Sequence, residues 1–220
     1  MRAPITPGAD PWTWLALAVA LAGPPLFVLI SRWSVGDSPP LPAQIMLQVL
    51  YCAMGVFVVW VVRRRERLPL ESIGLYRPGT STLLWGALLF GAIQLLPIVE
   101  RPLLRLFGSS GLEAGLQQLR AVPLCFRLVL GATGGVVEEI FYRGYAIERL
   151  ATLLNSRWLA GAVSAVVFGL AHIPYWGLRY SLAADLPFGI LMTAFYLWRR
   201  DLAANMLAHS AGLVLAMVTL

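Results

Sequence analysis

Long hydrophobic stretches alternate with short polar connectors along most of this 220-residue chain. Seven such stretches can be marked, at residues 12–30, 41–62, 81–99, 123–144, 158–173, 183–198 and 202–219. Most of them reach or approach the roughly 17–25 residues that a membrane-spanning helix needs. None shows the alternation typical of a transmembrane β-barrel. The pattern therefore predicts an all-α fold, a polytopic transmembrane helical bundle of about seven helices.

The connectors refine this prediction. Residues 101–122 mix apolar positions with charged and amide side chains, which favours an additional helix at the membrane interface. Pro123 can occupy the first turn of a helix, and Asn155 and Ser156 offer a stop and a restart, so we expect one helix from Pro123 to about Leu154. Nothing divides the chain further, and we expect residues 1–220 to form a single integral-membrane domain.

Composition and charge agree with a membrane protein. Hydrophobic residues make up 59% of the chain and charged residues 13%, with a mean hydropathy of +0.74. All 17 basic residues are arginines and give a net charge of +6. They flank the apolar stretches and form no patch interleaved with aromatic residues, so we expect contact with the headgroups of a lipid bilayer and no nucleic-acid partner. We expect a multi-pass protein of the cell membrane.

Ionisable side chains within the apolar stretches are the candidate functional residues, because such groups are costly in lipid. The adjacent acids Glu138 and Glu139 precede Arg143, and the two histidines of the chain, His172 and His209, lie in two later stretches. Glu138 and His172 are equally distant from the expected turn after Leu154, so an antiparallel helix pair brings them to similar depth. We therefore expect the carboxylates and both imidazoles to converge on one hydrated pocket.

Helical spacing assigns these residues different tasks. Glu139 and Arg143 are four apart and share a helix face, so we expect an ion pair. Glu138 is then free to face the pocket and to activate water as a general base. Two supporting residues precede the histidines at helical spacing, Phe168 before His172 and Asn205 before His209. Asn205 can orient the ring or contribute a hydrogen bond of its own.

Three kinds of chemistry suit one glutamate and two histidines. His172, His209 and Glu138 can hold a zinc ion that keeps an open position for water. Alternatively, Glu138 activates water unaided while both imidazoles polarise a carbonyl and stabilise its oxyanion. Haem ligation by two histidines leaves the acids and Arg143 without a task and ranks lowest. The cofactor prediction is therefore one divalent metal ion, zinc, or none.

These motifs resemble those of the CPBP intramembrane proteases, the CAAX prenyl endopeptidases of the Ras-converting type and their bacterial relatives. The resemblance rests on Glu138-Glu139-x-x-x-Arg143, Phe168-x-x-x-His172 and His209, and it covers about residues 70–215 as a catalytic core. It implies an intramembrane endopeptidase that hydrolyses a peptide bond of a membrane-associated protein or peptide, prenylated or not. Glu138 would then activate water, Glu139 and Arg143 would support it, and both histidines would act on the scissile carbonyl or on a metal.

One departure from the family pattern keeps other functions open. Leu213 stands four positions after His209, where the family often has an asparagine or another polar residue. If that residue helps to form the oxyanion hole, Asn205 or Ser210 must substitute for it, or activity is reduced. A non-catalytic membrane partner, such as a bacteriocin-immunity or scaffolding protein, is the alternative. A rhomboid-like serine mechanism is a further rival, because residues 108–111 read Gly-Ser-Ser-Gly, although a simple turn explains this sequence better.

Overall fold

The computed structural model describes residues 10–108 and 112–220, and its secondary structure there is helical, without strands. Six helices in this part are long and apolar enough to cross a membrane: Pro11–Val35, Leu41–Arg65, Thr80–Phe107, Arg157–Trp176, Leu178–Arg199 and Leu202–Thr219. A seventh long helix covers residues 124–154 and carries the charged motif. The predicted all-α transmembrane bundle is confirmed.

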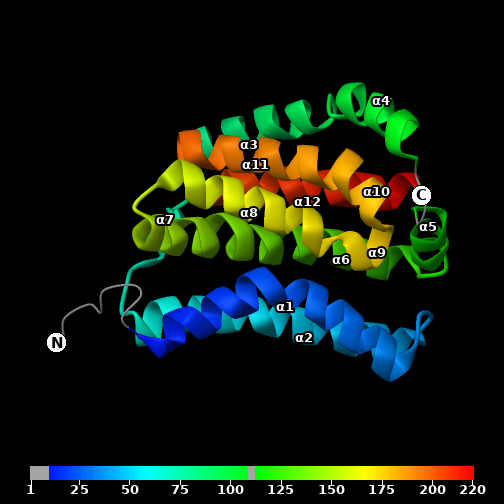
Figure 1. Cartoon of the computed structure of the whole chain (residues 1–220), viewed down its shortest axis with the longest axis horizontal. Helices are drawn as coiled ribbons and strands as arrows, with labels where there is room; N and C mark the ends of the chain where they lie inside the picture. Colours follow the sequence, from blue (N-terminus) through cyan, green and yellow to red (C-terminus); the bar gives the residue numbers. More distant parts are fainter. Residues whose placement is uncertain (1–9, 109–111) are drawn as a thin grey trace.

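The helices lie side by side in layers (Figure 1). α1 (Pro11–Val35) and α2 (Leu41–Trp60, continued by η1, Val61–Arg65) form one layer. The next holds the 124–154 helix and α8 (Arg157–Ala171), which is followed by the short α9 (Ile173–Trp176). α12 (Leu202–Thr219) packs between the 124–154 helix and α3 (Thr80–Ile93). α11 (Leu186–Arg199) packs on α8 and is preceded by α10 (Leu178–Tyr180) and η4 (Ser181–Asp185).

The helix over residues 124–154 is continuous, as the sequence predicts. It consists of α6 (Leu124–Glu138), the wider π-helical segment η3 (Glu139–Ile147) and α7 (Glu148–Leu154). Asn155 ends it in the left-handed conformation, with φ of 50°, which asparagine tolerates better than most residues. The Ser156 hydroxyl then accepts a hydrogen bond from the Leu159 amide and starts α8. This tight turn makes the two helices antiparallel neighbours.

The region predicted as one interfacial helix, residues 101–122, contributes to two helices. α4 (Pro97–Phe107) starts within the third apolar stretch and ends at Gly108, which has φ of 84°. α5 (Leu112–Arg120) follows after the undescribed residues 109–111. The chain breaks before α4 because Pro97 has no amide hydrogen to continue α3. A further short helix, η2 (Leu70–Ile73), lies in the connector before α3.

Small residues let α6 and α12 approach closely. A Cβ atom added to Gly135 would lie 2.6 Å from the Ser210 backbone nitrogen, and one added to Gly131 would lie 3.0 Å from the Val214 nitrogen. Small residues at helix contacts permit such close backbone packing in membranes. The contact sets His209, one residue before Ser210, beside the end of α6 where Glu138 and Glu139 lie.

Candidate active site

Glu138 and both histidines converge inside the bundle, although they come from three different helices. One carboxylate oxygen of Glu138, Oε2, lies 3.7 Å from Nε2 of His209 and 3.9 Å from Nε2 of His172. Glu138 ends α6, His172 follows the last residue of α8, and His209 lies in the middle of α12. The site is not sealed from its surroundings, because the side chains of Glu138 and His172 are 17% and 18% exposed. The expected equal depth of Glu138 and His172 is therefore present in the fold.

The backbone of α8 fixes which nitrogen of His172 is protonated. Nδ1 lies 2.8 Å from the carbonyl oxygen of Phe168, one turn earlier. A carbonyl oxygen can only accept a hydrogen bond, so Nδ1 must donate it. In the neutral ring, Nε2 then carries a lone pair and directs it toward Glu138. The ring also packs against Phe168, with centroids 4.5 Å apart.

Glu139 orients the second histidine. Its Oε1 atom lies 2.8 Å from Nδ1 of His209 and accepts a 2.9 Å hydrogen bond from the Arg143 guanidinium. The expected ion pair between Glu139 and Arg143 is thus present, and both side chains are fully buried. A carboxylate oxygen accepts hydrogen bonds, so the His209 Nδ1–H donates to it, as the Arg143 guanidinium does. Its Nε2 atom, like that of His172, faces Glu138.

Aromatic rings enclose these polar groups. Phe168 is 2% exposed and contacts both histidines, with its centroid 6.3 Å from that of His209. The Arg143 guanidinium lies 4.3 Å from the centroid of Phe168, a cation–π contact. Phe188 of α11 packs on His209 at 4.7 Å and on Phe168 at 5.8 Å. Phe168 was predicted to support the site, whereas nothing in the sequence pattern distinguished Phe188 from other apolar residues.

Asn205 and Ser210, which could replace a polar residue at position 213, form hydrogen bonds elsewhere. The Asn205 amide donates to the carbonyl of Met192 at 3.0 Å, and its Oδ1 atom is buried without a partner among the described residues. The Ser210 hydroxyl donates to the carbonyl of Ala132 at 2.9 Å. Leu213 lies against α6, where a Cβ atom on Gly134 would be 3.7 Å from its Cδ1 atom.

The site combines three hydrogen-bond acceptors: the Glu138 carboxylate and the two Nε2 lone pairs. With both rings neutral, each Nε2 acceptor lies within 4 Å of the Glu138 carboxylate, which is also an acceptor, so a proton donor or a cation is needed between them. Two imidazoles and a carboxylate are chemically suitable ligands for zinc. However, no group of three or more His, Cys, Asp and Glu side chains in the described part of the chain is arranged to hold a metal ion. A water molecule, with two protons to donate, suits the arrangement.

Sequence reasoning missed one acid near this site. Asp185, the last residue of η4, has a carboxylate oxygen that is buried without a hydrogen-bond partner in residues 10–108 and 112–220. The segment η4 packs against α8, whose last residue precedes His172. The signal was available, because Asp185 is an ionisable residue within the apolar stretch 183–198. Ser110, on which the serine-protease rival depends, lies outside the described residues.

Comparison with known proteins agrees with the resemblance. Residues 120–214 match the family model described as type II CAAX prenyl endopeptidase Rce1-like. The match contains the charged motif and both histidines, and it is narrower than the predicted core of residues 70–215. No curated protein and no solved structure matches the chain.

Proposed function

Because the chain belongs to the CPBP family of CAAX-type membrane proteases, we propose that it is an intramembrane endopeptidase in which Glu138 activates the hydrolytic water. One observation carries the proposal: the Nε2 atoms of both histidines lie within 4 Å of a single Glu138 oxygen. The carboxylate and the imidazoles thus enclose a space that holds a water molecule against a peptide carbonyl. Apart from this mechanism, the fold and the family support the more general function of a multi-pass membrane protease.

In the first step, Glu138 and His172 orient the water. The two protons of the water bond to the Glu138 carboxylate and to the Nε2 lone pair of His172. The water oxygen attacks the carbonyl carbon, and its proton passes to Glu138, which acts as the general base. The tetrahedral intermediate then carries the negative charge on the former carbonyl oxygen.

His209 is the group that stabilises this oxyanion. When its ring is protonated, Nδ1 donates to Glu139 and Nε2 donates toward the pocket. The Glu139–Arg143 pair holds the ring in this orientation, and the ring keeps both of its protons from the start of the reaction to its end. Glu138 then transfers its proton to the leaving nitrogen, the carbon–nitrogen bond breaks, and an acid and an amine are released. The proposed steps use the side chains of this chain and a water molecule alone, and they involve no metal ion.

The substrate is a membrane-associated protein or peptide. Six helices of the described chain are apolar enough to span a bilayer, and the proposed water site lies among them. A peptide bond at the membrane surface or within it therefore reaches Glu138, whereas a folded soluble domain does not. The apolar walls around the site suit hydrophobic residues beside the cleaved bond, with or without a prenyl group.

The test is cleavage of a library of membrane peptides by the purified full chain in liposomes, with the variants Glu138→Gln and Glu113→Gln. Glu113 is an exposed acid on α5, paired with Arg120, and serves as a matched control. We expect Glu138→Gln to abolish cleavage and Glu113→Gln to leave it unchanged. We also expect a chelator of divalent cations to have no effect. Full activity of Glu138→Gln would contradict the proposal, and loss of activity with chelator would replace the water mechanism by a metal mechanism.

The alternative to proteolysis is a non-catalytic membrane partner, and it depends on Leu213, the departure from the family pattern. Neither Asn205 nor Ser210 replaces the polar group, since both donate to backbone carbonyls elsewhere. The same library distinguishes the two functions. A partner protein would bind peptides without cleaving any. The double variant Glu138→Gln, His172→Ala would then still protect cells against a bacteriocin, whereas a protease would lose this protection.

A further inference from the structure

Tyr142 of η3 is fully buried, and its hydroxyl group has no hydrogen-bond partner in the described part of the chain. Two other tyrosines of this part, Tyr145 and Tyr196, are also fully buried, and each donates a 2.9 Å hydrogen bond to a glutamate. A buried tyrosine hydroxyl normally has such a partner, because leaving it unpaired costs free energy. The Tyr142 hydroxyl is therefore available to a group that the chain itself does not supply.

The position of Tyr142 on its helix directs this hydroxyl toward the candidate active site. Tyr142 lies four residues, about one turn, after Glu138. Long side chains on a helix lean toward its N-terminus, over the residue one turn earlier. The Tyr142 ring therefore extends from its own backbone toward the level of the Glu138 carboxylate.

Contacts with α8 place the same ring beside the site. Its centroid lies 5.1 Å from that of Phe168, and the two ring planes are nearly perpendicular. Phe168 comes one turn before His172 and packs on its imidazole at 4.5 Å. The Ser164 hydroxyl of α8 also donates to the backbone carbonyl of Tyr142, which fixes this part of η3 against α8. Because the two helices are antiparallel, the contact between Tyr142 and Phe168 lies one turn from the proposed water site.

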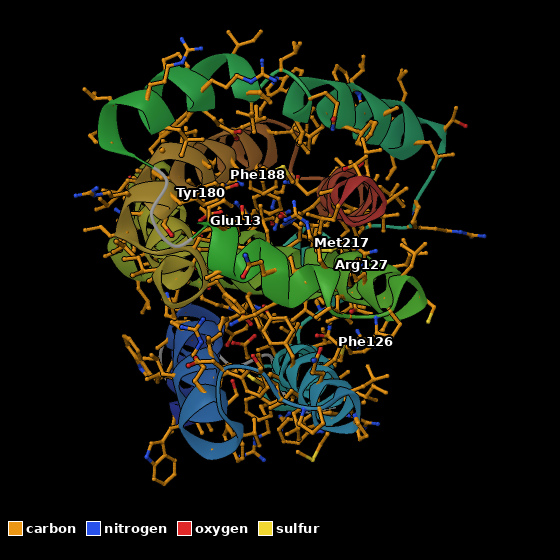
Figure 2. The ribbon with its side chains drawn as sticks, turned by 90° about the vertical axis from the view of Figure 1, so that its right-hand side faces the viewer. Glu113, Phe126, Arg127, Tyr180, Phe188 and Met217 are labelled. Carbon is orange, nitrogen blue, oxygen red and sulfur yellow. The ribbon has the colours of Figure 1, made fainter. Side chains whose placement is uncertain are left out.

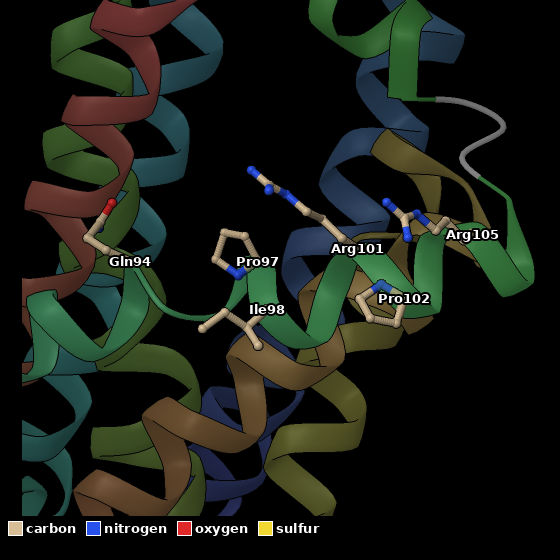
Figure 3. Close-up of a pocket in the computed structure, with 6 residues that line it drawn as sticks. All are labelled: Gln94, Pro97, Ile98, Arg101, Pro102 and Arg105. Carbon is tan, nitrogen blue, oxygen red and sulfur yellow. The ribbon is translucent and has the colours of Figure 1, made fainter.

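Apolar rings, which accept no ordinary hydrogen bond, continue this wall of the site. Phe188 of α11 stacks on Phe168 at 5.8 Å, and Figure 2 shows it inside the bundle below α4. The surface of α4 is different, because the exposed Arg101 and Arg105 line an open pocket there (Figure 3). Water and lipid headgroups reach such exposed groups and complete their hydrogen bonds. They do not reach the fully buried Tyr142 in this way, so its hydroxyl depends on a partner inside the site.

We propose that the Tyr142 hydroxyl donates a hydrogen bond to the attacking water and is a further catalytic residue. This inference rests on the proposed function. A water molecule has two protons and two lone pairs, directed approximately to the corners of a tetrahedron. In the proposed first step, its protons bond to Glu138 and His172. A hydrogen bond from Tyr142 then occupies one lone pair, and the other points at the peptide carbonyl.

This hydrogen bond orients the water and leaves the proton transfers unchanged. Tyr142 keeps its own proton, while Glu138 takes a proton from the water and transfers it to the leaving nitrogen. A water held by three hydrogen bonds has already lost the orientational freedom that the attack would otherwise remove. The fold alone would be served as well by phenylalanine, which would bury no hydroxyl. Chemistry and stability therefore favour different side chains at position 142.

The first test compares Tyr142→Phe with the matched control Tyr145→Phe in the purified full chain. Both variants keep the aromatic ring and remove one hydroxyl from η3. We expect Tyr142→Phe to lower kcat for membrane peptides by at least about tenfold, with KM within about twofold of wild type. Its unfolding temperature should equal or exceed that of wild type. Tyr145→Phe loses a hydrogen bond to Glu66 and should unfold at a lower temperature, with kcat within about threefold of wild type.

Binding of uncleavable peptides provides a second readout that needs no turnover. In leucine-rich peptides, each peptide bond in turn is replaced by a hydroxyethylene group, whose hydroxyl takes the place of the attacking water. The matched peptides carry an ethylene group, which has no hydroxyl, and fluorescence anisotropy in detergent measures both. We expect wild-type protein to bind the best hydroxyethylene peptide at least about tenfold more tightly than its ethylene counterpart. Tyr142→Phe should reduce this preference to less than about threefold, and Tyr145→Phe should retain it.

The two readouts separate this inference from the proposed function. If Glu138→Gln is inactive while Tyr142→Phe keeps full activity and the full hydroxyl preference, the protease is supported and the role of Tyr142 is overturned. A hydroxyl preference that depends on Tyr142, without any cleavage, would support its hydrogen bond and contradict the protease. If Tyr142→Phe unfolds at as low a temperature as Tyr145→Phe, the hydroxyl has a structural partner, which would also overturn the inference.

Discussion

At the scale of single residues, one imidazole contacts two adjacent carboxylates through its two nitrogens. Neighbouring residues on a helix point about 100° apart, so the sequence indicates separate partners for Glu138 and Glu139. His209 can reach both carboxylates, although they point in different directions, because its Nδ1 and Nε2 atoms lie on different edges of the ring. It bonds Glu139 with one edge and faces Glu138 with the other. The two acids therefore belong to one site but have different tasks.

Because the two acids have different tasks, the same substitution should lower the reaction rate at Glu138 and the stability of the fold at Glu139. Glu138→Gln retains the shape of a partly exposed side chain and removes only the proposed base, so we expect at least a 10³-fold loss of kcat with little change in stability. Glu139→Gln leaves the Arg143 charge buried without its partner and should lower the free energy of unfolding by about 3–5 kcal/mol. Peptide cleavage and thermal unfolding of both variants in one detergent provide the measurements. Equal unfolding temperatures for the two variants would contradict the assignment.

Leu213 gives a second prediction at this scale. It lies against α6 at Gly134, one turn from Glu138, and supplies no hydrogen-bond donor. If the family's polar residue at this position helps to stabilise the oxyanion, Leu213→Asn should raise kcat by up to about 10²-fold and leave KM nearly unchanged. Leu213→Met retains the volume without a donor and serves as the control. A similar rate for both variants would indicate that His209 alone serves the oxyanion.

Much of the site could be predicted from sequence because charged residues are conspicuous within apolar stretches. Glu138, Glu139, Arg143 and both histidines stand out for this reason, and the fold brings them together. Asp185 stands out in the same way within residues 183–198. Phe188 could not be found in this way, because an aromatic residue in an apolar helix carries no sign of what it contacts. Its position depends on how α11 packs against α12, which is a tertiary property.

At the scale of elements, the sequence predicts helix limits well where a local chemical signal exists. Asn155 and Ser156 supply such a signal, and the helix that begins after Pro123 ends there. The break between α3 and α4 is different, because Pro97 lies inside a stretch that hydropathy alone reads as continuous. The π-helical turns of η3 are also invisible to periodicity, since the polar and apolar residues of 139–147 are spaced as in an ordinary amphipathic helix. Such turns occur frequently at functional sites.

The contact between α6 and α12 is the element-scale feature that sets the position of His209. Gly135→Ala would place a methyl group 2.6 Å from the backbone of Ser210 and force the helices apart. We expect a loss of about 1–3 kcal/mol in stability and a fall in kcat, because His209 moves with α12. Gly91→Ala on α3 is the matched control, since its methyl group would meet no atom within 4 Å. It should be neutral or stabilising by about 0.5–1 kcal/mol. Equal stability of the two variants would contradict close packing.

At the scale of the whole molecule, a buried carboxylate joins the layer of α1 and α2 to the helix that carries the site. Glu66 follows η1 and is fully buried. Arg149 of α7 donates to both of its oxygens, at 2.6–3.1 Å. Thr13 of α1 and Tyr145 of η3 each donate to it at 2.9 Å. The N-terminal helices are thus attached to the proposed catalytic core, far along the same helix from Glu138.

This attachment predicts how the whole chain responds when one of its charges is removed. Arg149→Met leaves the Glu66 carboxylate buried with only neutral donors, and should lower the free energy of unfolding by about 3–5 kcal/mol. It should also speed cleavage by trypsin at the exposed arginines of residues 63–67, because the Glu66 contacts hold that segment in its folded conformation. The double variant Glu66→Gln, Arg149→Met removes both charges and should recover a large part of the lost stability.

Arg120→Met is the control. It breaks an exposed pair with Glu113 and should lower the free energy of unfolding by less than about 1 kcal/mol. Thermal unfolding and limited proteolysis compare all three variants. If Arg149→Met is no less stable than Arg120→Met, the N-terminal helices depend on apolar packing alone, and the Glu66 cluster does not attach them.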